Sequence, residues 1–528
     1  MLILQDVMYK HPNQDVLFSG LDMTVHSAQK IALVGNNGAG KSTLLRLVAG
    51  ELPLTSGSVF LDVKLYYVPQ LFGQFDHLTV AQALRIDQKL TALQQILRGE
   101  VSDENMHLLD DDWSIEERSR EALAYWQLND VDLMQPLSDL SGGQKTKVFL
   151  AGIAIHQPEL VLLDEPSNHL DMAGRGLLYD YITHTKNTLL VVSHDRALLN
   201  LLDQVFELNR KTITAYGGDY EFYRAQKAIG IEALHHDLHS KEKALRKAKQ
   251  VERESIERQQ KLDARGKKKQ AKAGLPTISM NTFRNNAERS TARMKGVHEE
   301  KVDGASKELD SLRKQLPGAD KMKMDFDDSS LHKGKRLVVA DELNFRYADE
   351  WLWATPLSFQ INSGERVAIR GDNGSGKTTL VRLLLGELVP SLGSLQNSAS
   401  RMVYIDQEYS LIDNSRNVYH QAQKFNTGSL SEHEVKSRLT KFLFDKDNWD
   451  RPCAALSGGE RMRLVLCCLT LDPIPPDIII LDEPTNNLDL QNVEILTNAV
   501  NDYNGTLIVI SHDAYFLEQV NVTGLTEL

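Results

Sequence analysis

Cysteine is scarce in this chain of 528 residues, which contains only three: Cys453, Cys467 and Cys468. Three cysteines cannot build a disulfide framework or a four-cysteine metal site by themselves. Long apolar runs are also missing, since a stretch such as VRLLLGELV is far shorter than the roughly 18 to 20 residues that a membrane span needs. The N-terminal MLILQDVMYKHPNQ lacks the basic start and the long apolar stretch of a signal peptide. These absences favour a reduced, cytoplasmic protein that has no membrane partner.

Basic residues are outnumbered, with 60 Lys and Arg against 72 Asp and Glu, and the net charge is −12. Averaged over the whole chain, this acidic balance argues against nucleic acid as a partner. The charge is unevenly spread, however. Residues 241–301 contain 18 basic and 8 acidic residues, a local balance of +10, so the rest of the chain carries −22. The average therefore hides a strongly basic segment.

The chain contains an internal repeat. GNNGAGKSTLLRLVAGEL, which begins at Gly35, returns 336 residues later as GDNGSGKTTLVRLLLGEL. LSGGQ, LVLLDEPSNHLD and VVSHD in the first half return in the same order as LSGGE, IIILDEPTNNLD and VISHD. We therefore predict two copies of one α/β domain, at residues 1–218 and 337–528, joined by a linker at residues 219–336.

The first copy is longer than the second between its glutamine motif and its LSGG motif. The interval is 70 residues from Gln70 to Leu140 but 49 residues from Gln407 to Leu456. We place the roughly 21 extra residues within residues 85–113. A solvent-facing excursion and a segment that contacts a partner are both open interpretations.

A phosphate-binding loop of the pattern GxxxxGK[ST] lies between a strand-like and a helix-like run in each copy. Its glycines let backbone N–H groups converge on phosphate oxygens at a helix N-terminus, where the helix dipole favours anions. The lysines would reach the β- and γ-phosphates of ATP, and the hydroxyls of Ser42 and Thr378 would bind Mg²⁺. The predicted ATP-binding residues are Gly35, Asn36, Asn37, Gly38, Ala39, Gly40, Lys41, Ser42 and Thr43 in the first copy, and Gly371, Asp372, Asn373, Gly374, Ser375, Gly376, Lys377, Thr378 and Thr379 in the second.

Two carboxylates end a buried strand in each copy, in LVLLDE and IIILDE. Because side chains alternate along a strand, the two carboxylates of a pair point in different directions. Asp164 and Asp482 are suited to bind the metal. Glu165 and Glu483 are suited to polarise the attacking water as general bases.

Two further polar residues recur at matched positions. His194 and His512 each follow a strand and lie 29 residues after the glutamate of their own copy. This equal spacing favours a contact to the γ-phosphate or to the attacking water over a structural role. Gln70 and Gln407 each end a strand as well, and we predict that they contact both Mg²⁺ and the water.

LSGGQ and LSGGE open helix-like runs in their copies, and each provides a second helix N-terminus that attracts anions. Taken alone, either could be an ordinary serine-capped helix. Two phosphate loops and two such helices suggest that each loop faces the helix of the other copy, with two ATP molecules bound between the copies of one monomer. The predicted residues are Ser141, Gly142, Gly143 and Gln144, and Ser457, Gly458, Gly459 and Glu460.

The linker is predicted to form an antiparallel helical hairpin. Residues 220–266 lack proline and are rich in Ala, Glu, Lys, Gln and Arg, which is typical of a long exposed helix. Gly274 and Pro276 interrupt the pattern, and helical composition resumes over about residues 283–316. A helix of about 50 residues would project roughly 75 Å.

Basic residues gather near the predicted end of this hairpin, and RNA phosphate is their natural complement. A solvated helix face is the alternative explanation for the charges. Apolar residues that include Leu275 and Phe283 also occupy the loop, where they either pack the turn or contact a partner. The predicted RNA-binding residues are Arg265, Lys267, Lys268, Lys269, Lys272, Arg284, Arg289 and Arg293.

Taken together, the phosphate loop, glutamine, signature LSGGQ, Asp-Glu strand and histidine resemble the ATP-binding cassette (ABC) ATPases over some 410 residues. Two cassettes in one chain, a charged helical linker and the segment AYGGDYEFY before it resemble the ABC-F subfamily of ribosome-associated ATPases. The resemblance implies ATP hydrolysis with Mg²⁺ and cassettes that close on ATP. It also implies binding in the ribosomal tRNA exit site, with the linker directed toward the peptidyl-transferase centre, 23S-type rRNA and the P-site tRNA.

Two functions are compatible with this resemblance: modulation of translation, and protection against ribosome-targeting antibiotics. The alternative from another class is the ATP-hydrolysing subunit of a membrane transporter, although such a subunit would not need a long basic hairpin. The family's adenine-stacking aromatic corresponds to Tyr347, 24 residues before Gly371. The same interval before Gly35 gives His11, and the second signature ends in Glu460 in place of Gln. We expect both sites to hydrolyse ATP and leave their equivalence open.

Overall fold

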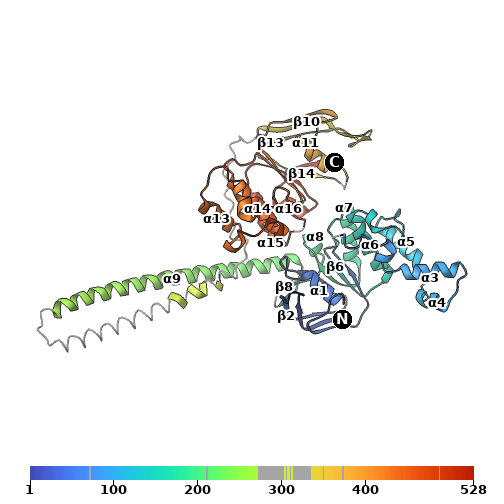
Figure 1. The fold of residues 1–528 in the computed structure, drawn as a ribbon, viewed down its shortest axis with the longest axis horizontal. Coiled ribbons are helices and arrows are strands. Elements are labelled where there is room, and N and C mark those ends of the chain that lie inside the picture. Colours follow the sequence, from blue (N-terminus) through green and yellow to red (C-terminus); the bar gives the residue numbers. More distant parts are fainter. Residues whose placement is uncertain are drawn as a thin grey trace. The chain divides into compact units, whose positions relative to one another are not determined.

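The structure is a computed structural model that describes residues 1–70, 73–209, 212–270, 302–304, 306–309, 311–312, 334–348, 350–371, 374–486 and 488–528. Its residues group into two compact units. One unit consists of Met1–Tyr223 and Lys321–Leu528 and contains both copies of the repeat. The other, Arg224–Asp320, lies within the predicted linker. In Figure 1 the two copies are coloured blue to teal and yellow to red.

The first copy is built on a six-stranded sheet in the order β5-β6-β7-β3-β8-β9, which is parallel except for the antiparallel pair β8 and β9. A parallel sheet is covered on both faces, so its strands are continuous apolar runs. LVLLD and TLLVV, for example, are buried at every position. The strands are β3 (Lys30–Val34), β5 (Leu65–Val68), β6 (Leu160–Asp164), β7 (Thr188–Val192), β8 (Gln204–Leu208) and β9 (Ile213–Tyr216).

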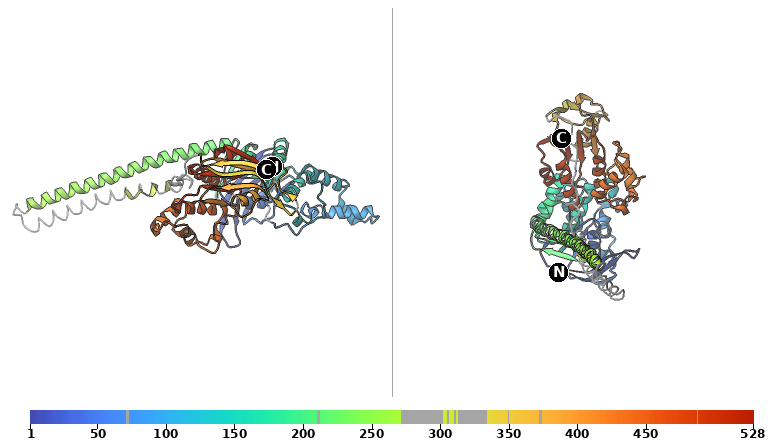
Figure 2. Two further views of the ribbon diagram at one scale, coloured as in Figure 1. Left: turned by 90° about the horizontal axis from the view of Figure 1, so that it is seen from above. Right: turned by 90° about the vertical axis from the view of Figure 1, so that its left-hand side faces the viewer.

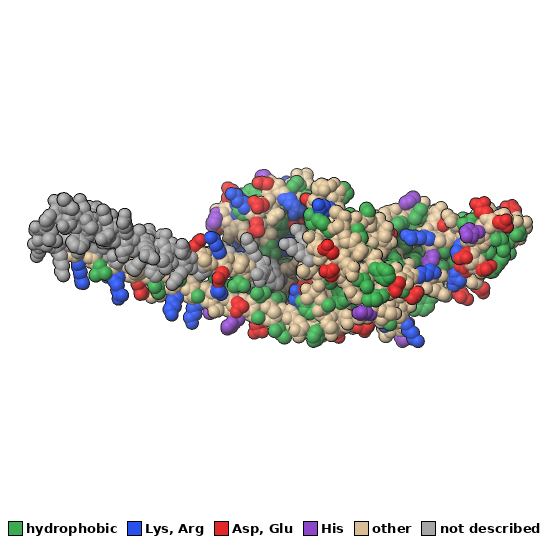
Figure 3. All heavy atoms as spheres, turned by 90° about the horizontal axis from the view of Figure 1, so that it is seen from below, with side chains coloured by type: hydrophobic (Ala, Val, Ile, Leu, Met, Phe, Trp, Pro, Cys, Tyr) green, Lys and Arg blue, Asp and Glu red, His purple; other side chains and the backbone are tan. Residues whose placement is uncertain are grey.

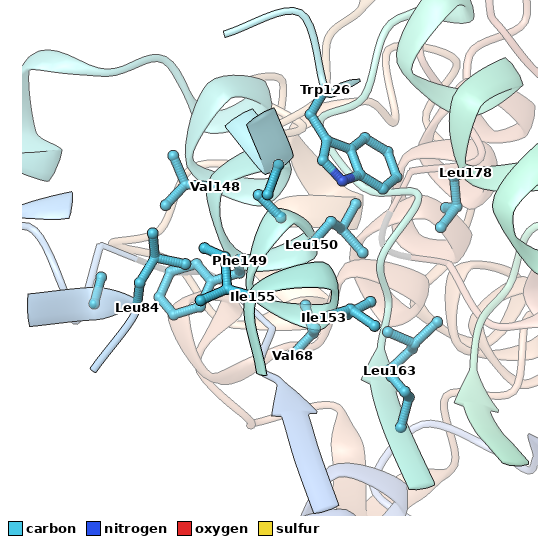
Figure 4. Packing of buried hydrophobic residues seen from close by; sticks show 14 of the residues in the cluster. Val68, Leu84, Trp126, Val148, Phe149, Leu150, Ile153, Ile155, Leu163 and Leu178 are labelled. Atoms are coloured by element: carbon cyan, nitrogen blue, oxygen red, sulfur yellow. The ribbon is translucent and has the colours of Figure 1, made fainter. Parts of the chain in front are cut away.

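The alternation of side chains along β6 separates two hydrophobic cores. Val161 and Leu163 face the cluster that helix α6 (Gly142–His156) and Trp126 complete on one side of the sheet (Figure 4). Leu160 and Leu162 face the other cluster, which contains helix α1 (Lys41–Val48). That second cluster also includes an antiparallel sheet, ordered β2-β1-β4, made of β1 (Leu2–Lys10), β2 (Val16–Val25) and β4 (Ser56–Leu61). The main sheet of the first copy thus lies between two hydrophobic cores, one on each face.

The second copy repeats this arrangement, which confirms the predicted α/β tandem. Its main sheet is parallel throughout, in the order β16-β17-β18-β14-β19, and its antiparallel sheet has the order β13-β10-β15. A short pair, β11 (Arg346–Tyr347) and β12 (Glu350–Trp351), is added. The strands are β10 (Arg336–Asn344), β13 (Leu357–Asn362), β14 (Arg366–Arg370), β15 (Leu392–Asn397), β16 (Met402–Ile405), β17 (Ile478–Asp482), β18 (Thr506–Ile510) and β19 (Gly524–Glu527).

Apart from α3 and α4, the helices correspond between the copies as well. In the first copy they are α1, α2 (Val80–Ala83), α3 (Asp87–Leu97), α4 (Asp103–Leu109), α5 (Ile115–Tyr125), α6, α7 (Met172–His184) and α8 (Arg196–Leu199). In the second copy they are α11 (Lys377–Leu384), α12 (Val418–Lys424), α13 (Glu432–Lys441), α14 (Gly458–Leu471), α15 (Leu490–Asp502) and α16 (Ala514–Gln519).

The extra residues of the first copy form the helices α3 and α4. Asp87–Leu97 and Asp103–Leu109 lie within the predicted range of residues 85–113. Leu97, the last residue of α3, and Val101, in the connection to α4, are 72% and 67% exposed. Figure 3 shows hydrophobic and acidic side chains together on the part of the first copy that these helices form. The segment therefore exposes apolar side chains that its own copy does not cover.

The linker begins with one continuous helix, α9 (Tyr220–Gln270) (Figure 2). It extends past the predicted end at Gly266, because no proline interrupts the chain before Pro276 and a single glycine costs a helix only about 1 kcal/mol. Residues 302–304, 306–309 and 311–312 are helical too. Lys241 Nζ contacts Glu308 Oε2 at 2.5 Å, so this segment pairs with α9 as the predicted hairpin requires. The predicted loop at residues 274–281 lies outside the described residues.

The sequence predicts no disulfide framework and no membrane span. The three cysteines are free and buried, and burial raises the pKa of Cys467 to about 12, so its thiol stays protonated. No helix that the structure describes is both long and apolar enough to cross a membrane. Among the same residues, no three His, Cys, Asp or Glu side chains gather to hold a metal ion by themselves.

Candidate functional site

The phosphate loops connect an inner strand of each main sheet, β3 or β14, to a helix. In the first copy the loop runs from the end of β3 at Val34 to Lys41, the first residue of α1. Lys41 Nζ donates a hydrogen bond to the Gly35 carbonyl at 2.7 Å, and Lys377 Nζ donates to the Gly371 carbonyl at 2.6 Å. Each lysine thus folds back over its own loop. This places an ammonium group at a helix N-terminus, where a phosphate would bind.

Asp164 ends β6 beside the phosphate loop. Its Oδ1 accepts a hydrogen bond from Ser42 Oγ at 3.1 Å, and its Oδ2 accepts one from Tyr67 Oη at 3.2 Å. In the second copy Asp482 Oδ2 accepts a hydrogen bond from Tyr404 Oη at 2.7 Å. A hydroxyl and a carboxylate brought this close are oxygen ligands of the kind that Mg²⁺ prefers when it also binds nucleotide phosphates. The donor set of the first copy therefore fits a magnesium ion.

The glutamate that follows each aspartate adopts an unusual backbone conformation. Glu165 has φ of 51° and Glu483 has φ of 46°, in the left-handed region that side chains other than glycine rarely occupy. Strained residues of this kind cluster at functional sites. The turn directs each carboxylate toward the histidine of its own copy: His194 Nε2 lies 3.2 Å from Glu165 Oε1, and His512 Nε2 lies 3.3 Å from Glu483 Oε1.

Burial sets the protonation of these pairs. It raises the pKa of Glu165 to about 7, against the opposing attraction of Lys41, and it raises the pKa of Glu483 to about 7. Burial, with the charge of Lys41, holds the pKa of His194 well below its usual value, so this imidazole is neutral. A carboxylate with a pKa near the working pH has the basicity required of a general base.

One cavity of about 380 Å³ brings the predicted residues of the first copy together. Residues from the loop, from the end of β5 and from the carboxyl ends of β6 and β7 meet there, at the edge where open α/β sheets bind their ligands. Asp164 adjoins this cavity through its bond to Ser42. The lining residues are Asn37, Gly38, Gly40, Lys41, Ser42, Thr43, Gln70, Glu165, Asn168, Val192 and His194.

The two predicted adenine-stacking residues lie in different surroundings. Tyr347 is 53% exposed, and its Oη lies 3.1 Å from Thr379 Oγ1 in the helix after the second phosphate loop. A base stacked on this ring would lie close to the loop that holds its phosphates. His11 lies in the turn after β1, with its ring against Tyr9, and is not among the residues that line the cavity. Its contact with adenine stays a prediction.

The signature motifs form the N-termini of α6 and α14, as predicted. Ser141 and Ser457 are the N-caps, and each accepts a hydrogen bond from the backbone N–H three residues later. The glycines allow a close approach of the loop after the Asp-Glu strand, because a Cβ on Gly143 would lie 2.7 Å from the His169 carbonyl oxygen. Neither signature lines the cavity of the first copy. Docking of each signature against the other copy's loop is therefore a proposal.

Hydrogen bonds and apolar packing join the two copies within their compact unit. The Asn37 N–H in the first phosphate loop donates to Asp489 Oδ2 at 3.0 Å. Asn200 Nδ2 donates to Tyr515 Oη at 3.0 Å, and Leu490 packs against the core of the first copy. The first phosphate loop thus meets the TNNLD loop of the second copy, which lies next to the second signature at Asn492.

Two groups of residues at the sites were missed by the sequence reasoning. Tyr67 and Tyr404 donate hydrogen bonds to the aspartates that are predicted to bind the metal. The signal was available, since each tyrosine lies three residues before the glutamine of its copy. Arg175 gave no such signal, because Val493 occupies its position in the second copy. After burial, the charge of Arg175 is the largest influence on the pKa of Glu483, and it lowers that pKa. The two sites therefore differ in a charged group.

Lowering the pH from 8 to 6 is expected to reduce kcat for ATP by about tenfold. Glu165 and Glu483 have pKa values of about 7, so they take up protons over this range and can no longer accept one from water. Steady-state kcat at saturating ATP, measured at half-unit intervals, tests this expectation. ATP binding at the same pH values is the control, since the two carboxylates act in the chemical step. A constant kcat down to pH 6 would mean that another group is the base.

Comparison with known protein families identifies two matching segments. The family model described as ABC transporter matches residues 18–168 and 354–486. The ATP-binding protein YdiF of Bacillus subtilis is 31% identical over 98% of this chain and 79% of its own length. The ATP-binding protein Uup of Haemophilus influenzae is 30% identical over 95% of this chain and 75% of its own. ABC transporter F family member 5 of Arabidopsis thaliana is 29% identical over 94% of this chain and 70% of its own length.

Solved structures support the same fold at lower identity. The archaeal ribosome recycling factor aABCE1, solved in complex with the ribosomal stalk protein aP1, matches 99% of this chain and 87% of that chain with a TM-score of 0.61 at 20% identity. A structure titled RNase-L Inhibitor matches 98% of this chain and 86% of that chain with a TM-score of 0.59. At such identities these structures are evidence for the tandem fold alone.

Proposed function

This chain belongs to the ATP-binding cassette family, in its ABC-F branch, and hydrolyses ATP; from this premise we propose that it binds the ribosome in its ATP-bound state and modulates translation. The observation that carries the proposal is the placement of charge. Two cassettes on an otherwise acidic chain are joined by a segment with a balance of +10 over residues 241–301. Phosphate-rich RNA is the partner that such a basic segment complements.

We propose that each cassette binds one ATP through its phosphate loop. Lys41 and Lys377 neutralise the phosphates, and the backbone N–H groups of the loops donate to their oxygens. Mg²⁺, when bound, supplies further neutralisation of the phosphates, and Ser42, Asp164 and Gln70 would hold it in the first site. Thr378, Asp482 and Gln407 would hold it in the second site. Glu165 and Glu483 then accept the proton of the attacking water, and the histidines orient those carboxylates.

Closure of the cassettes around ATP is proposed to control binding to the ribosome. The contact of Asn37 with Asp489 supports a pairing in which the first phosphate loop meets the second signature within one monomer. ATP would complete this pairing by joining the loop of one cassette to the signature helix of the other. Hydrolysis removes the bridging phosphate and favours opening.

On the ribosome, we propose that the protein binds at the tRNA exit site, with the linker directed toward the P-site tRNA and the peptidyl-transferase centre. Arg265 is exposed on α9, and Lys267, Lys268 and Lys269 belong to the last turns of that helix. Lys272, Arg284, Arg289 and Arg293 lie outside the described residues. Protection against antibiotics bound at the peptidyl-transferase centre is a specialised form of the same proposal. It would act in the cytoplasm.

The test is co-sedimentation with ribosomes. A full-length chain carrying Glu165→Gln and Glu483→Gln should retain ATP and stay closed, so with ATP it should sediment with ribosomes through sucrose and arrest growth when expressed. The wild-type chain with ADP should remain at the top of the gradient. If the variant stays there with ATP as well, ribosome binding is wrong.

A second variant locates the RNA contact. Adding Lys267→Ala, Lys268→Ala and Lys269→Ala should remove the variant from the ribosome fraction in a salt-dependent manner, because each lost phosphate contact weakens binding. The same three changes in the wild-type chain should leave the ATPase rate of the free protein unchanged. If the three changes do not affect co-sedimentation, the RNA contact does not lie at these linker lysines.

A further inference from the structure

The two signature motifs differ in a pair of residues that change together. Glu460 ends the second signature where Gln144 ends the first. Arg451, five residues before that motif, corresponds to Gln135 of the first copy. The match is structural as well, since the Val80 N–H donates to the Gln135 carbonyl and the Val418 N–H donates to the Arg451 carbonyl. An Arg–Glu pair in one copy thus replaces a Gln–Gln pair in the other.

In the second copy the two side chains form an ion pair at the helix start. Arg451 Nη1 donates to Glu460 Oε1 at 2.7 Å, and Arg451 also donates to the Ala455 carbonyl. The other carboxylate oxygen, Oε2, accepts from the Ser457 N–H at 2.8 Å and from the Ser457 hydroxyl at 2.9 Å. One carboxylate therefore connects Arg451 to the serine of the signature.

The charge of Glu460 is fixed by these contacts. Burial opposes its ionisation, but the hydrogen bonds from Ser457 and Arg451 outweigh burial and lower its pKa, so the side chain is a carboxylate at neutral pH. The side chains of Arg451 and Glu460 are only 35% and 22% exposed, which limits screening by solvent. A negative charge is therefore present at the helix N-terminus that is proposed to face a phosphate.

In the first copy an uncharged side chain completes the N-cap of α6. Gln144 Oε1 accepts from the Ser141 N–H at 2.9 Å, and the Gln144 N–H donates to Ser141 Oγ at 3.3 Å. The N-cap is complete in both copies, so capping alone does not require the arginine. What distinguishes the second copy is a carboxylate that would repel an approaching phosphate unless a cation neutralised it.

We infer that Arg451 is a positioning residue for the ATP on the first phosphate loop: it neutralises Glu460 and holds it against Ser457, so that the N-terminus of α14 can receive a phosphate. The inference rests on the proposed pairing of each loop with the other copy's signature. Arg451 acts through Glu460 and needs no contact with ATP. The two nucleotide sites therefore differ in the signature that faces them. The second loop faces the uncharged Gln144, and the first loop faces the ion pair of Arg451 and Glu460.

The experiment is a double-mutant cycle on the full chain, without ribosomes, in a Lys377→Ala background that leaves the first phosphate loop as the binding site. Arg451→Gln removes the ion-pair partner of Glu460 and should weaken ATP binding by about tenfold. Glu460→Gln alone should change it by less than about threefold. The double variant recreates the Gln–Gln pair and should bind within about threefold of its parent, a recovery that also shows that the chain is folded.

The outcomes separate the inference from its premise. Equal losses in Arg451→Gln and in the double variant would overturn it, because the arginine would then act independently of Glu460. The same cycle in a Lys41→Ala background reports on the second loop. An effect confined to that background would mean that each signature serves its own copy's loop, which overturns the pairing and the inference with it. Since ribosomes are absent, a failure of ribosome binding affects none of these results.

Discussion

Replacing both Glu165 and Glu483 with glutamine is expected to reduce ATP hydrolysis by about 10²- to 10⁴-fold, the usual contribution of a general base. Each carboxylate lies beside a histidine at the carboxyl end of its strand, and burial raises its pKa to about 7. Glutamine keeps the shape and the acceptor oxygen but cannot take a proton from water. Steady-state release of phosphate measures the loss, and binding of labelled ATP should be retained.

The single variants resolve the contribution of each site. Because both sites are expected to hydrolyse ATP, Glu165→Gln and Glu483→Gln alone should each leave part of the activity. Arg175 acts on Glu483 and has no charged counterpart at Val493, so the two single variants should differ in residual rate and in pH profile. A double variant that keeps more than a tenth of the wild-type rate would exclude these glutamates as the bases.

The stability of the double variant checks that the loss is chemical. The folded-state pKa of each glutamate, at about 7, lies above the ordinary value of 4.5. The native state therefore holds these protons more tightly than the unfolded chain does, and the two groups oppose folding as the pH rises from about 4.5 through 7. Glutamine removes that cost. At pH 8 the apparent Tm of the variant should equal or exceed that of the wild type, and the difference should shrink at pH 5.

Much of this fold can be read from local patterns. Strands buried on both faces, such as LVLLD and IIILD, appear as unbroken apolar runs, and the repeat shows that both runs occupy the same place in one architecture. The phosphate loops, the carboxylates and the histidines are recognisable because their chemistry requires particular residues at particular intervals. The helical linker is recognisable from its lack of proline.

Contacts between distant segments could not be predicted in this way. Asn37 and Asp489 are separated by 452 residues, and nothing in either segment specifies the other. Tyr67 and Tyr404 could be taken for ordinary strand residues, because tyrosine is common in strands whether or not its hydroxyl donates to an aspartate. The pair of Arg451 and Glu460 becomes visible only when the structure shows that Gln135 and Arg451 occupy equivalent positions.

Replacing Gly376 with alanine is expected to reduce ATP binding to one molecule per chain, with affinity at the second site falling by about 100-fold or more. Gly376 has φ of 95° at the N-cap of α11, a conformation that costs an L-residue about 1–2 kcal/mol. A Cβ there would lie 2.7 Å from Leu352 Cδ2 and 3.0 Å from Trp353 Nε1. Trp353 is buried and donates to the Ser375 carbonyl in the loop, so it has little room to move.

Gly386→Ala is the matched control for this expectation, because it separates the backbone cost from the steric one. Gly386 follows α11 in the same cassette, has φ of 75°, and nothing lies within 4 Å of its expected Cβ. This variant should lose stability of about 1 kcal/mol and still bind two ATP molecules. Only Gly376→Ala should displace the loop and, with it, Lys377, whose Nζ now contacts the Gly371 carbonyl. Displacements of about 1 Å at such a site can cost about 100-fold. If titration with ATP gave two sites for Gly376→Ala, the close packing of Leu352 and Trp353 would not determine the shape of this loop.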